Sequence, residues 1–99
     1  MRGNRIEPGE VEAALLEHPA VTAAAVLADG TGLNTRLVAF LACDPAHVPS
    51  YLELKRHSAA RLPRYMIPDE FRILSRLPYT RNGKIDRAAL VRSTAQPGA

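Results

Sequence analysis

The sequence comprises 99 residues, of which 46% are hydrophobic and 23% are charged. This length fits one domain with a modest core, and the composition is that of a folded globular protein rather than a disordered one. No apolar run is as long as a membrane span and no secretory signal opens the chain, so we expect a cytoplasmic protein with no membrane partner. The single cysteine, Cys43, excludes an internal disulfide.

The net charge of +3 conceals an uneven distribution along the chain. Residues 1–53 carry three arginines against seven acidic residues, a net charge of −4, whereas residues 54–99 carry ten basic against three acidic residues, a net charge of +7. The basic half predicts an anionic partner, such as a phosphate-bearing small molecule, an acidic protein surface or nucleic acid. Because aromatic residues make up only 5% of the chain and Trp is absent, nucleic acid is disfavoured.

The histidines do not predict a metal site. His18, His47 and His57 lie far apart in the sequence and lack the spacing of metal ligands. We therefore expect each of them to be structural or to face solvent, and we expect no metal centre in this chain.

The first half of the chain predicts a helix followed by a β-hairpin. After a loop and a very short strand within residues 2–6, Pro8 is well placed to open a helix, because a proline at the first helical position sacrifices no hydrogen bond. Helical spacing predicts one buried face, made by Val11, Ala14, Leu15 and His18. The apolar runs 21–28 and 37–43 should pair antiparallel around a loop at 29–36, with both faces covered.

The second half predicts a helix, a strand and a final short helix. Ser50 and Glu53 form a capping-box pattern, so a helix should begin at Tyr51 and end at Leu62. Its predicted buried face consists of Tyr51, Leu54, Ser58 and Leu62. An irregular connection (64–68) precedes a strand over 71–77. Asp86 should cap a helix running through Val91, and residues 93–99 are expected to be a tail or linker after a domain formed by residues 1–92.

This order of elements predicts a small α+β domain. We expect a mainly antiparallel three-stranded sheet, with a short extra hairpin or strand pair, packed by two to three helices. The helix between the predicted hairpin and the last strand also permits one parallel pairing.

The segment Asn82-Gly83-Lys84 is the strongest local turn signal in the chain. Both Asn and Gly tolerate positive φ at little cost, so a tight turn is expected here. Lys84 should then stand at the tip or shoulder of the turn, where its ammonium can be presented to a phosphate or a carboxylate. A solvated surface lysine is the other interpretation of these residues taken alone.

Two stretches of the sequence together resemble a known family. One is residues 2–12 (RGNRIEPGEVE), and the other comprises residues 62–68 (LPRYMIP) and 77–87 (LPYTRNGKIDR). They are similar to the eighth and tenth core motifs of the adenylation domains of nonribosomal peptide synthetases, which belong to the superfamily of adenylate-forming enzymes. The resemblance spans nearly the whole chain, and it corresponds to the small C-terminal lid subdomain.

The resemblance implies a role in two successive half-reactions. In the family, a carboxylate attacks the α-phosphate of ATP to give an acyl-adenylate, and the phosphopantetheine thiol of a carrier protein then attacks that adenylate. The lid rotates between the two steps. Implied partners are the N-terminal adenylation subdomain, which binds most of the ATP and Mg, and a peptidyl carrier protein domain. We expect a monomeric fragment of an amino-acid-activating ligase in secondary metabolism such as antibiotic biosynthesis, inactive by itself.

The resemblance also assigns residues to each step. Lys84 would be the catalytic residue of adenylate formation, and the nucleotide or phosphate would be contacted by Arg5, Gly83 and Lys84. After rotation, the loop beside the pantetheine tunnel would be formed by Arg2, Gly3 and Asn4.

Alternatives remain open at this level. The same lid occurs in acyl- and aryl-CoA synthetases, and the motifs do not separate that branch with certainty. A non-catalytic basic module that binds an acidic protein or nucleic acid is an alternative of a different class. A carrier surface could use Arg56, Arg61 or Arg64, among which the sequence does not choose.

Overall fold

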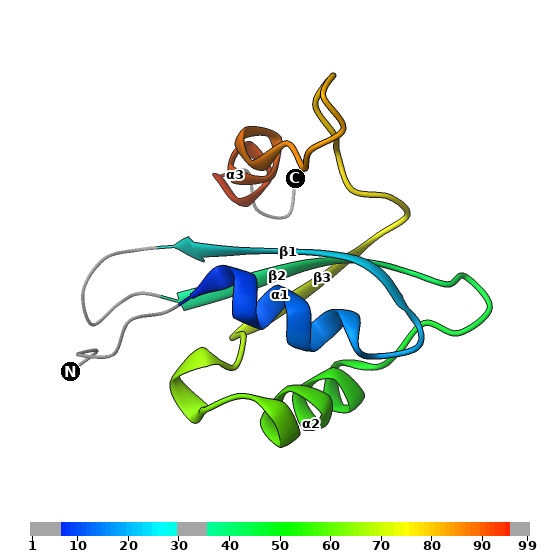
Figure 1. Cartoon of the computed structure of the whole chain (residues 1–99), viewed down its shortest axis with the longest axis vertical. Coiled ribbons are helices and arrows are strands. Elements are labelled where there is room, and N and C mark those ends of the chain that lie inside the picture. Colours follow the sequence, from blue (N-terminus) through cyan, green and yellow to red (C-terminus); the bar gives the residue numbers. More distant parts are fainter. Residues whose placement is uncertain (1–6, 30–35, 96–99) are drawn as a thin grey trace.

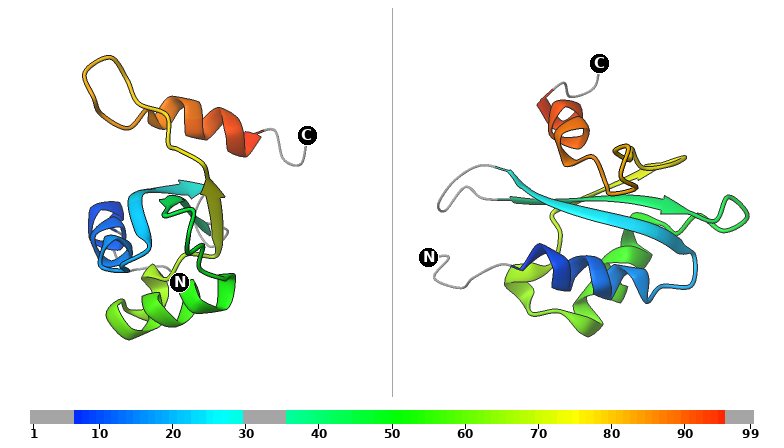
Figure 2. Two further views of the ribbon diagram at one scale, coloured as in Figure 1. Left: turned by 90° about the vertical axis from the view of Figure 1, so that its right-hand side faces the viewer. Right: turned by 45° about the horizontal axis from the view of Figure 1, so that its top comes forward.

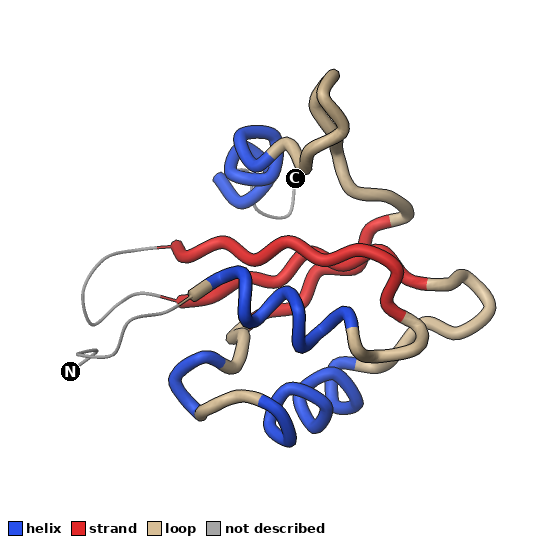
Figure 3. Tube along the Cα trace, viewed as in Figure 1, coloured by secondary structure: helices blue, strands red, loops and turns tan. Residues whose placement is uncertain are grey.

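The structure, a computed structural model, describes residues 7–29 and 36–95. Figure 1 and Figure 3 show the helices and strands that these residues form. In chain order they are helix α1 (Pro8–Leu16), strands β1 (Val21–Asp29) and β2 (Arg36–Cys43), helix α2 (Tyr51–Arg61), the 3-10 helix η2 (Arg64–Met66), strand β3 (Glu70–Leu74) and helix α3 (Arg87–Ala95). The α+β class is confirmed.

The three strands form one mixed sheet in the order β1-β2-β3. Strands β1 and β2 pair antiparallel, with Val26 opposite Ala39, as the two apolar runs predicted. Strands β2 and β3 pair parallel, because α2 carries the chain back before β3 begins. The one parallel pairing that the sequence analysis allowed is therefore present. An antiparallel bridge between Tyr79 and Ile85 supplies the expected short extra hairpin.

The sheet separates two hydrophobic clusters. Helices α1 and α2 cover one face, and α3 with the Tyr79–Ile85 hairpin lies over the other (Figure 1 and Figure 2). The first cluster includes Val11, Leu15, Val26, Leu37, Leu41, Leu54 and Met66. The second cluster consists of Ala25, Val38, Phe40, Ala42, Leu77 and Leu90. Strand β2 is buried from Leu37 to Ala42 because it contributes alternate side chains to each cluster.

Local sequence determines how the first two helices begin. Proline opens α1, whose predicted face is buried, including His18 just beyond the helix end. Ser50 caps α2 by accepting a hydrogen bond from the Glu53 N–H at 3.1 Å. The prediction of a buried Tyr51 is wrong: its side chain is 54% exposed, and its ring makes an edge contact with Phe71. Tyr51 lies in the first turn of α2, at the rim of the core rather than within it.

The end of the chain differs from the prediction in two places. Strand β3 ends at Leu74 rather than at Leu77, because the chain bends at Ser75 and crosses to the face where Leu77 is buried. Helix α3 is capped as predicted, with the Asp86 carboxylate accepting from the Ala89 N–H at 3.1 Å. The helix continues to Ala95, into the segment that we expected to be a tail. The division into domain and tail stays a prediction.

Candidate active-site hairpin

The segment that carries Lys84 is a narrow hairpin that projects from the sheet (Figure 1 and Figure 2). At its base the Asp86 N–H donates to the Pro78 carbonyl at 2.9 Å. Further out, the Thr80 N–H donates to the Lys84 carbonyl at 2.7 Å. Backbone hydrogen bonds therefore run along the whole hairpin, so that its tip is held by secondary structure although it projects into solvent.

The turn uses positive φ at one residue only. Gly83 has φ of +81°, and no other described residue, Asn82 included, has a positive φ. The Gly83 N–H donates to the Thr80 carbonyl at 3.0 Å, which closes a four-residue turn that ends at the glycine. This is the arrangement of a three-residue hairpin loop with glycine in the left-handed region. The predicted tight turn is present, but Asn82 does not adopt the positive φ for which the sequence analysis noted it.

Lys84 is exposed beside the turn, and Arg81 and Asn82 next to it are also exposed. Within the described residues, no ion pair engages the Lys84 ammonium. The nearest acidic residue in the sequence, Asp86, is occupied as the cap of α3. The hairpin thus offers a solvated cation on a long flexible stem, which can neutralise an anion supplied from outside the domain.

The base of the hairpin is anchored on both sides. Leu77 precedes it and Leu90 follows it, each 1% exposed, and both pack in the second cluster with Phe40. Ile85 is half-buried against the same cluster. The tip is therefore polar and exposed whereas the base is apolar and fixed to the central strand.

The structure brings together only part of the predicted site. Gly83 and Lys84 lie together at the tip of the hairpin. The other predicted residues, Arg2, Gly3, Asn4 and Arg5, lie outside the described residues, so their roles stay predictions. The first described residue of their motif, Glu7, is the N-cap of α1 on the far side of the sheet from the hairpin.

Sequence reasoning missed a cluster of the three histidines. The His18 Nδ1 accepts a hydrogen bond from the Ala20 N–H at 3.0 Å, so the ring proton is on Nε2, which lies 2.6 Å from the Glu53 carboxylate. His47 lies 3.5 Å from the same oxygen, and the ring of His57 meets that of His18 edge-on. These hydrogen bonds, chiefly from His18, lower the pKa of Glu53.

No local signal joins these residues, because the contacts depend on how α1 packs against α2. Among the described residues, no group of three or more His, Cys, Asp or Glu side chains is arranged to hold a metal ion. The histidine cluster is therefore a junction between the two helices on the face opposite to Lys84.

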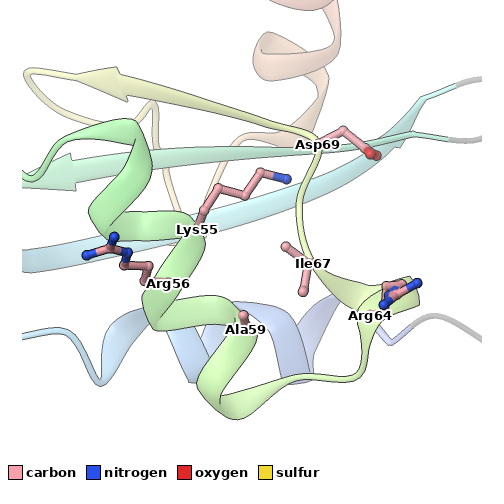
Figure 4. A pocket seen from close by; sticks show the side chains of 6 residues that line it. All are labelled: Lys55, Arg56, Ala59, Arg64, Ile67 and Asp69. Atoms are coloured by element: carbon pink, nitrogen blue, oxygen red, sulfur yellow. The ribbon is translucent and has the colours of Figure 1, made fainter.

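A groove of about 440 Å³ lies between α2 and the η2 segment, lined by Lys55, Arg56, Ala59, Arg64, Ile67 and Asp69. Figure 4 shows Lys55 extending across it, and the Lys55 ammonium donates to the Pro68 carbonyl at 2.7 Å. The side chains of Arg56 and Arg64 lie at opposite ends of the view. The groove is lined by basic residues, but their charged groups do not point toward a common position, so it does not form a phosphate-binding site.

Comparison with known proteins identifies the fold. A family model described as "AMP-binding enzyme C-terminal domain" matches residues 10–84, which run from α1 to the catalytic-lysine candidate at the hairpin tip. The chain belongs to the AMP-binding enzyme C-terminal domain family. Within the described part of this domain, no helix has the length and the apolar character needed to cross a membrane.

Curated relatives of the domain are ligases and peptide synthetases. It is 55% identical to an L-proline--[L-prolyl-carrier protein] ligase of Pseudomonas fluorescens over 92 residues, covering 93% of this chain and 18% of that protein. It is 42% identical to the phosphinothricin tripeptide synthetase PhsC of Streptomyces viridochromogenes over 99 residues, covering 99% of this chain and 9% of that protein.

Solved structures agree with these relatives. A four-domain nonribosomal peptide synthetase bound to AMP and glycine is 39% identical, with a TM-score of 0.76 over 90% of this chain and 7% of that one. The anthranilate CoA ligase AuaEII is 31% identical, with a TM-score of 0.80 over 97% of this chain and 19% of that one. The domain thus spans less than a fifth of each of these proteins.

Proposed function

We propose that this domain is the mobile lid of an amino-acid-activating adenylation enzyme, and that Lys84 acts in the adenylate-forming step. The observation that carries the proposal is the projecting hairpin, which presents Lys84 as an exposed cation at its tip. The similarity to a prolyl-carrier protein ligase and to peptide synthetases supports the same conclusion. ATP with Mg would be substrate, bound mainly by an N-terminal domain, and the lid would add one charge to that site.

Electrostatics explains what the lysine would contribute. When the substrate carboxylate attacks the α-phosphate, two anions approach each other and negative charge builds on the phosphate oxygens. An ammonium placed between them offsets this repulsion and stabilises the transition state more than the separated reactants. A rigid hairpin lets Lys84 enter a site on another domain while its backbone stays ordered.

In the second step the rotated lid would present the segment before α1 to the phosphopantetheine of a carrier protein. Arg5 would meet the adenylate phosphate, and Gly3, with Arg2 and Asn4, would leave room for the pantetheine arm. Helix α1, which follows that segment and has Glu7 as its N-cap, lies on the opposite side of the sheet from the hairpin (Figure 1). Two functions on two faces are compatible with a rotation that exposes them in turn.

The test uses the full-length enzyme that contains this domain. Lys84→Ala should reduce amino-acid-dependent pyrophosphate exchange by on the order of 100- to 1000-fold, the usual loss when one preorganised charge is removed. Transfer from preformed aminoacyl-adenylate to the carrier should stay close to wild type. Arg92→Ala is the control, because Arg92 is an exposed base in the last turn of α3, a helix that runs away from the hairpin (Figure 2). Equal loss in both half-reactions would refute the role of Lys84.

The second candidate function is the lid of a CoA ligase, and the similarity to the anthranilate CoA ligase favours it. The same assay separates the two, because a CoA ligase transfers the acyl group to free CoA and a peptide synthetase transfers it to a carrier protein. The higher sequence identity to the prolyl-carrier protein ligase supports transfer to a carrier protein. A basic binding module gains no support from the arrangement of charges, since three arginines of the basic half, Arg61, Arg72 and Arg87, each pair with a glutamate.

A further inference from the structure

One ion pair joins the two motif stretches of the chain. Glu12 ends the first stretch and Arg87 ends the second, and the Arg87 Nη2 lies 2.9 Å from the Glu12 Oε2. The Glu12 side chain is only 16% exposed, whereas that of Arg87 is 47% exposed. Because one partner is largely withdrawn from water, this pair is screened less by solvent than a fully exposed pair.

Both side chains also bind the backbone of a single residue in strand β1. The Val26 N–H donates to the Glu12 Oε2 at 2.8 Å, and the Val26 carbonyl accepts from the Arg87 Nη1 at 3.2 Å. Strand β1 is an edge of the sheet, and because these two groups of Val26 bond to Glu12 and Arg87, they lie on the open side of the strand, away from β2. At Val26 the ion pair therefore supplies the donor and the acceptor that a neighbouring strand would supply.

The pair also bridges the two faces of the sheet. Glu12 belongs to α1 on one face, and Arg87 is the first residue of α3 on the other face (Figure 1). Arg87 directly follows Asp86, whose N–H closes the base of the hairpin that carries Lys84. A shift of Arg87 is therefore transmitted to the hairpin through one peptide unit.

Apolar contacts at the base of the hairpin fix its distance from the sheet, but they constrain its rotation relative to the sheet less strongly. Leu77 and Leu90 fix the hairpin to the second cluster beneath it. Packing of this kind is not directional, whereas the Arg87 guanidinium is held by two acceptors, the Glu12 carboxylate and the Val26 carbonyl. The two contacts fix the direction in which α3 starts and so the direction in which the hairpin points.

We propose that Glu12 and Arg87 are positioning residues that set the angle of the Lys84 hairpin relative to α1. This inference rests on the proposed function of Lys84 in adenylate formation. Neither residue needs to touch substrate. A displacement of about 1 Å at a reacting group can cost on the order of 100-fold in rate, so a loosened hairpin should be costly for the step that uses Lys84.

The test measures both half-reactions in the full-length enzyme. Glu12→Ala and Arg87→Ala should each reduce adenylate formation by about 10- to 100-fold, mainly in kcat, with the KM for amino acid little changed. The double variant should be no worse than the poorer single variant, because either change breaks the same link. Transfer from preformed adenylate should stay close to wild type.

Milder variants separate positioning from folding. Arg87→Lys keeps the charge but cannot reproduce the fixed fork that contacts Glu12 and Val26, so it should recover only part of the lost rate. Glu12→Gln keeps an acceptor for the Val26 N–H and should also be intermediate. Glu17→Ala is the matched control, because Glu17 makes an exposed ion pair with Arg61 between α1 and α2, away from the hairpin.

The results distinguish the two proposals. Additive losses, or equal losses in both half-reactions that follow a fall in thermal stability, would overturn the positioning role. Wild-type adenylate formation in both alanine variants would overturn it as well, while a large loss in a parallel Lys84→Ala variant would leave the function of Lys84 intact. If Lys84→Ala itself spares adenylate formation, the proposed function fails and the positioning inference fails with it.

Discussion

Gly83 and Gly9 allow one substitution to be compared in two backbone conformations. At both positions an added Cβ would meet no heavy atom within 4 Å, so alanine causes no steric contact at either site. Gly83 has φ of +81°, whereas Gly9 lies in the first turn of α1 with helical conformation. Any difference between the two alanine variants must therefore come from the backbone.

The expected effects have opposite signs. An L-residue in the left-handed region costs roughly 1–2 kcal/mol, so Gly83→Ala should destabilise the native hairpin by about that amount. Gly9→Ala should stabilise the domain by about 0.5 kcal/mol, because alanine has less backbone entropy to lose and a better helix propensity. Gly83→Asn should cost less than Gly83→Ala, since asparagine tolerates positive φ.

Urea unfolding gives the global effect, and hydrogen exchange gives the local one. The Thr80 amide is the local reporter, because it is bonded to the Lys84 carbonyl at 2.7 Å. If the hairpin opens without global unfolding, the strain appears as faster exchange at Thr80 with a smaller change in the urea midpoint. Gly83→Ala and Gly9→Ala variants of equal stability and equal Thr80 exchange would refute the reasoning.

Two further predictions concern the core and the histidine junction. Leu90→Ala should lower the free energy of unfolding by about 3 kcal/mol, because the Leu90 side chain is fully buried with Phe40. The control Val91→Ala, at a position 53% exposed, should change the free energy of unfolding by less than about 0.5 kcal/mol. Equal losses for the two variants in urea titrations would contradict this prediction. The pKa of Glu53 is lowered by its hydrogen bond to His18, so its charged form stabilises the fold above the ordinary value of 4.5, and this contribution is lost as pH falls through the lowered value. Glu53→Gln should therefore flatten the acid side of the stability–pH curve, and parallel curves for variant and wild type would be the contrary result.

Most of the secondary structure could be predicted because local rules determine it. Pro8, Ser50 and Asp86 begin helices through propensity and capping, and the apolar runs of β1 and β2 are strand-like by composition. The end of β3 and the exposure of Tyr51 could not be predicted, because they depend on which face of the sheet receives the later residues. That choice is made by tertiary packing rather than by neighbouring residues in the sequence.

The candidate site was predictable to a similar degree. The turn and the exposure of Lys84 follow from Asn82 and Gly83, although only the glycine takes positive φ. The contact of Arg87 with Glu12 links residues far apart in the sequence, and each taken alone is an ordinary helix residue. No spacing rule connects them, so only the folded chain reveals that the two motif stretches touch.

The separation of the core by strand β2 has a consequence for synthesis of the chain. The first cluster, together with the half-buried Phe71 packed against it, uses residues made before Leu77. The other face of β2, with Phe40 at its centre, is covered only when Leu77 and Leu90 have been made. During translation the α1–α2 side can therefore assemble while Phe40 remains open to water. A ribosome that pauses before Leu90 would leave an apolar sheet face available to chaperones. The apolar contacts at the base of the Lys84 hairpin would then form late, because they need both Leu77 and Leu90.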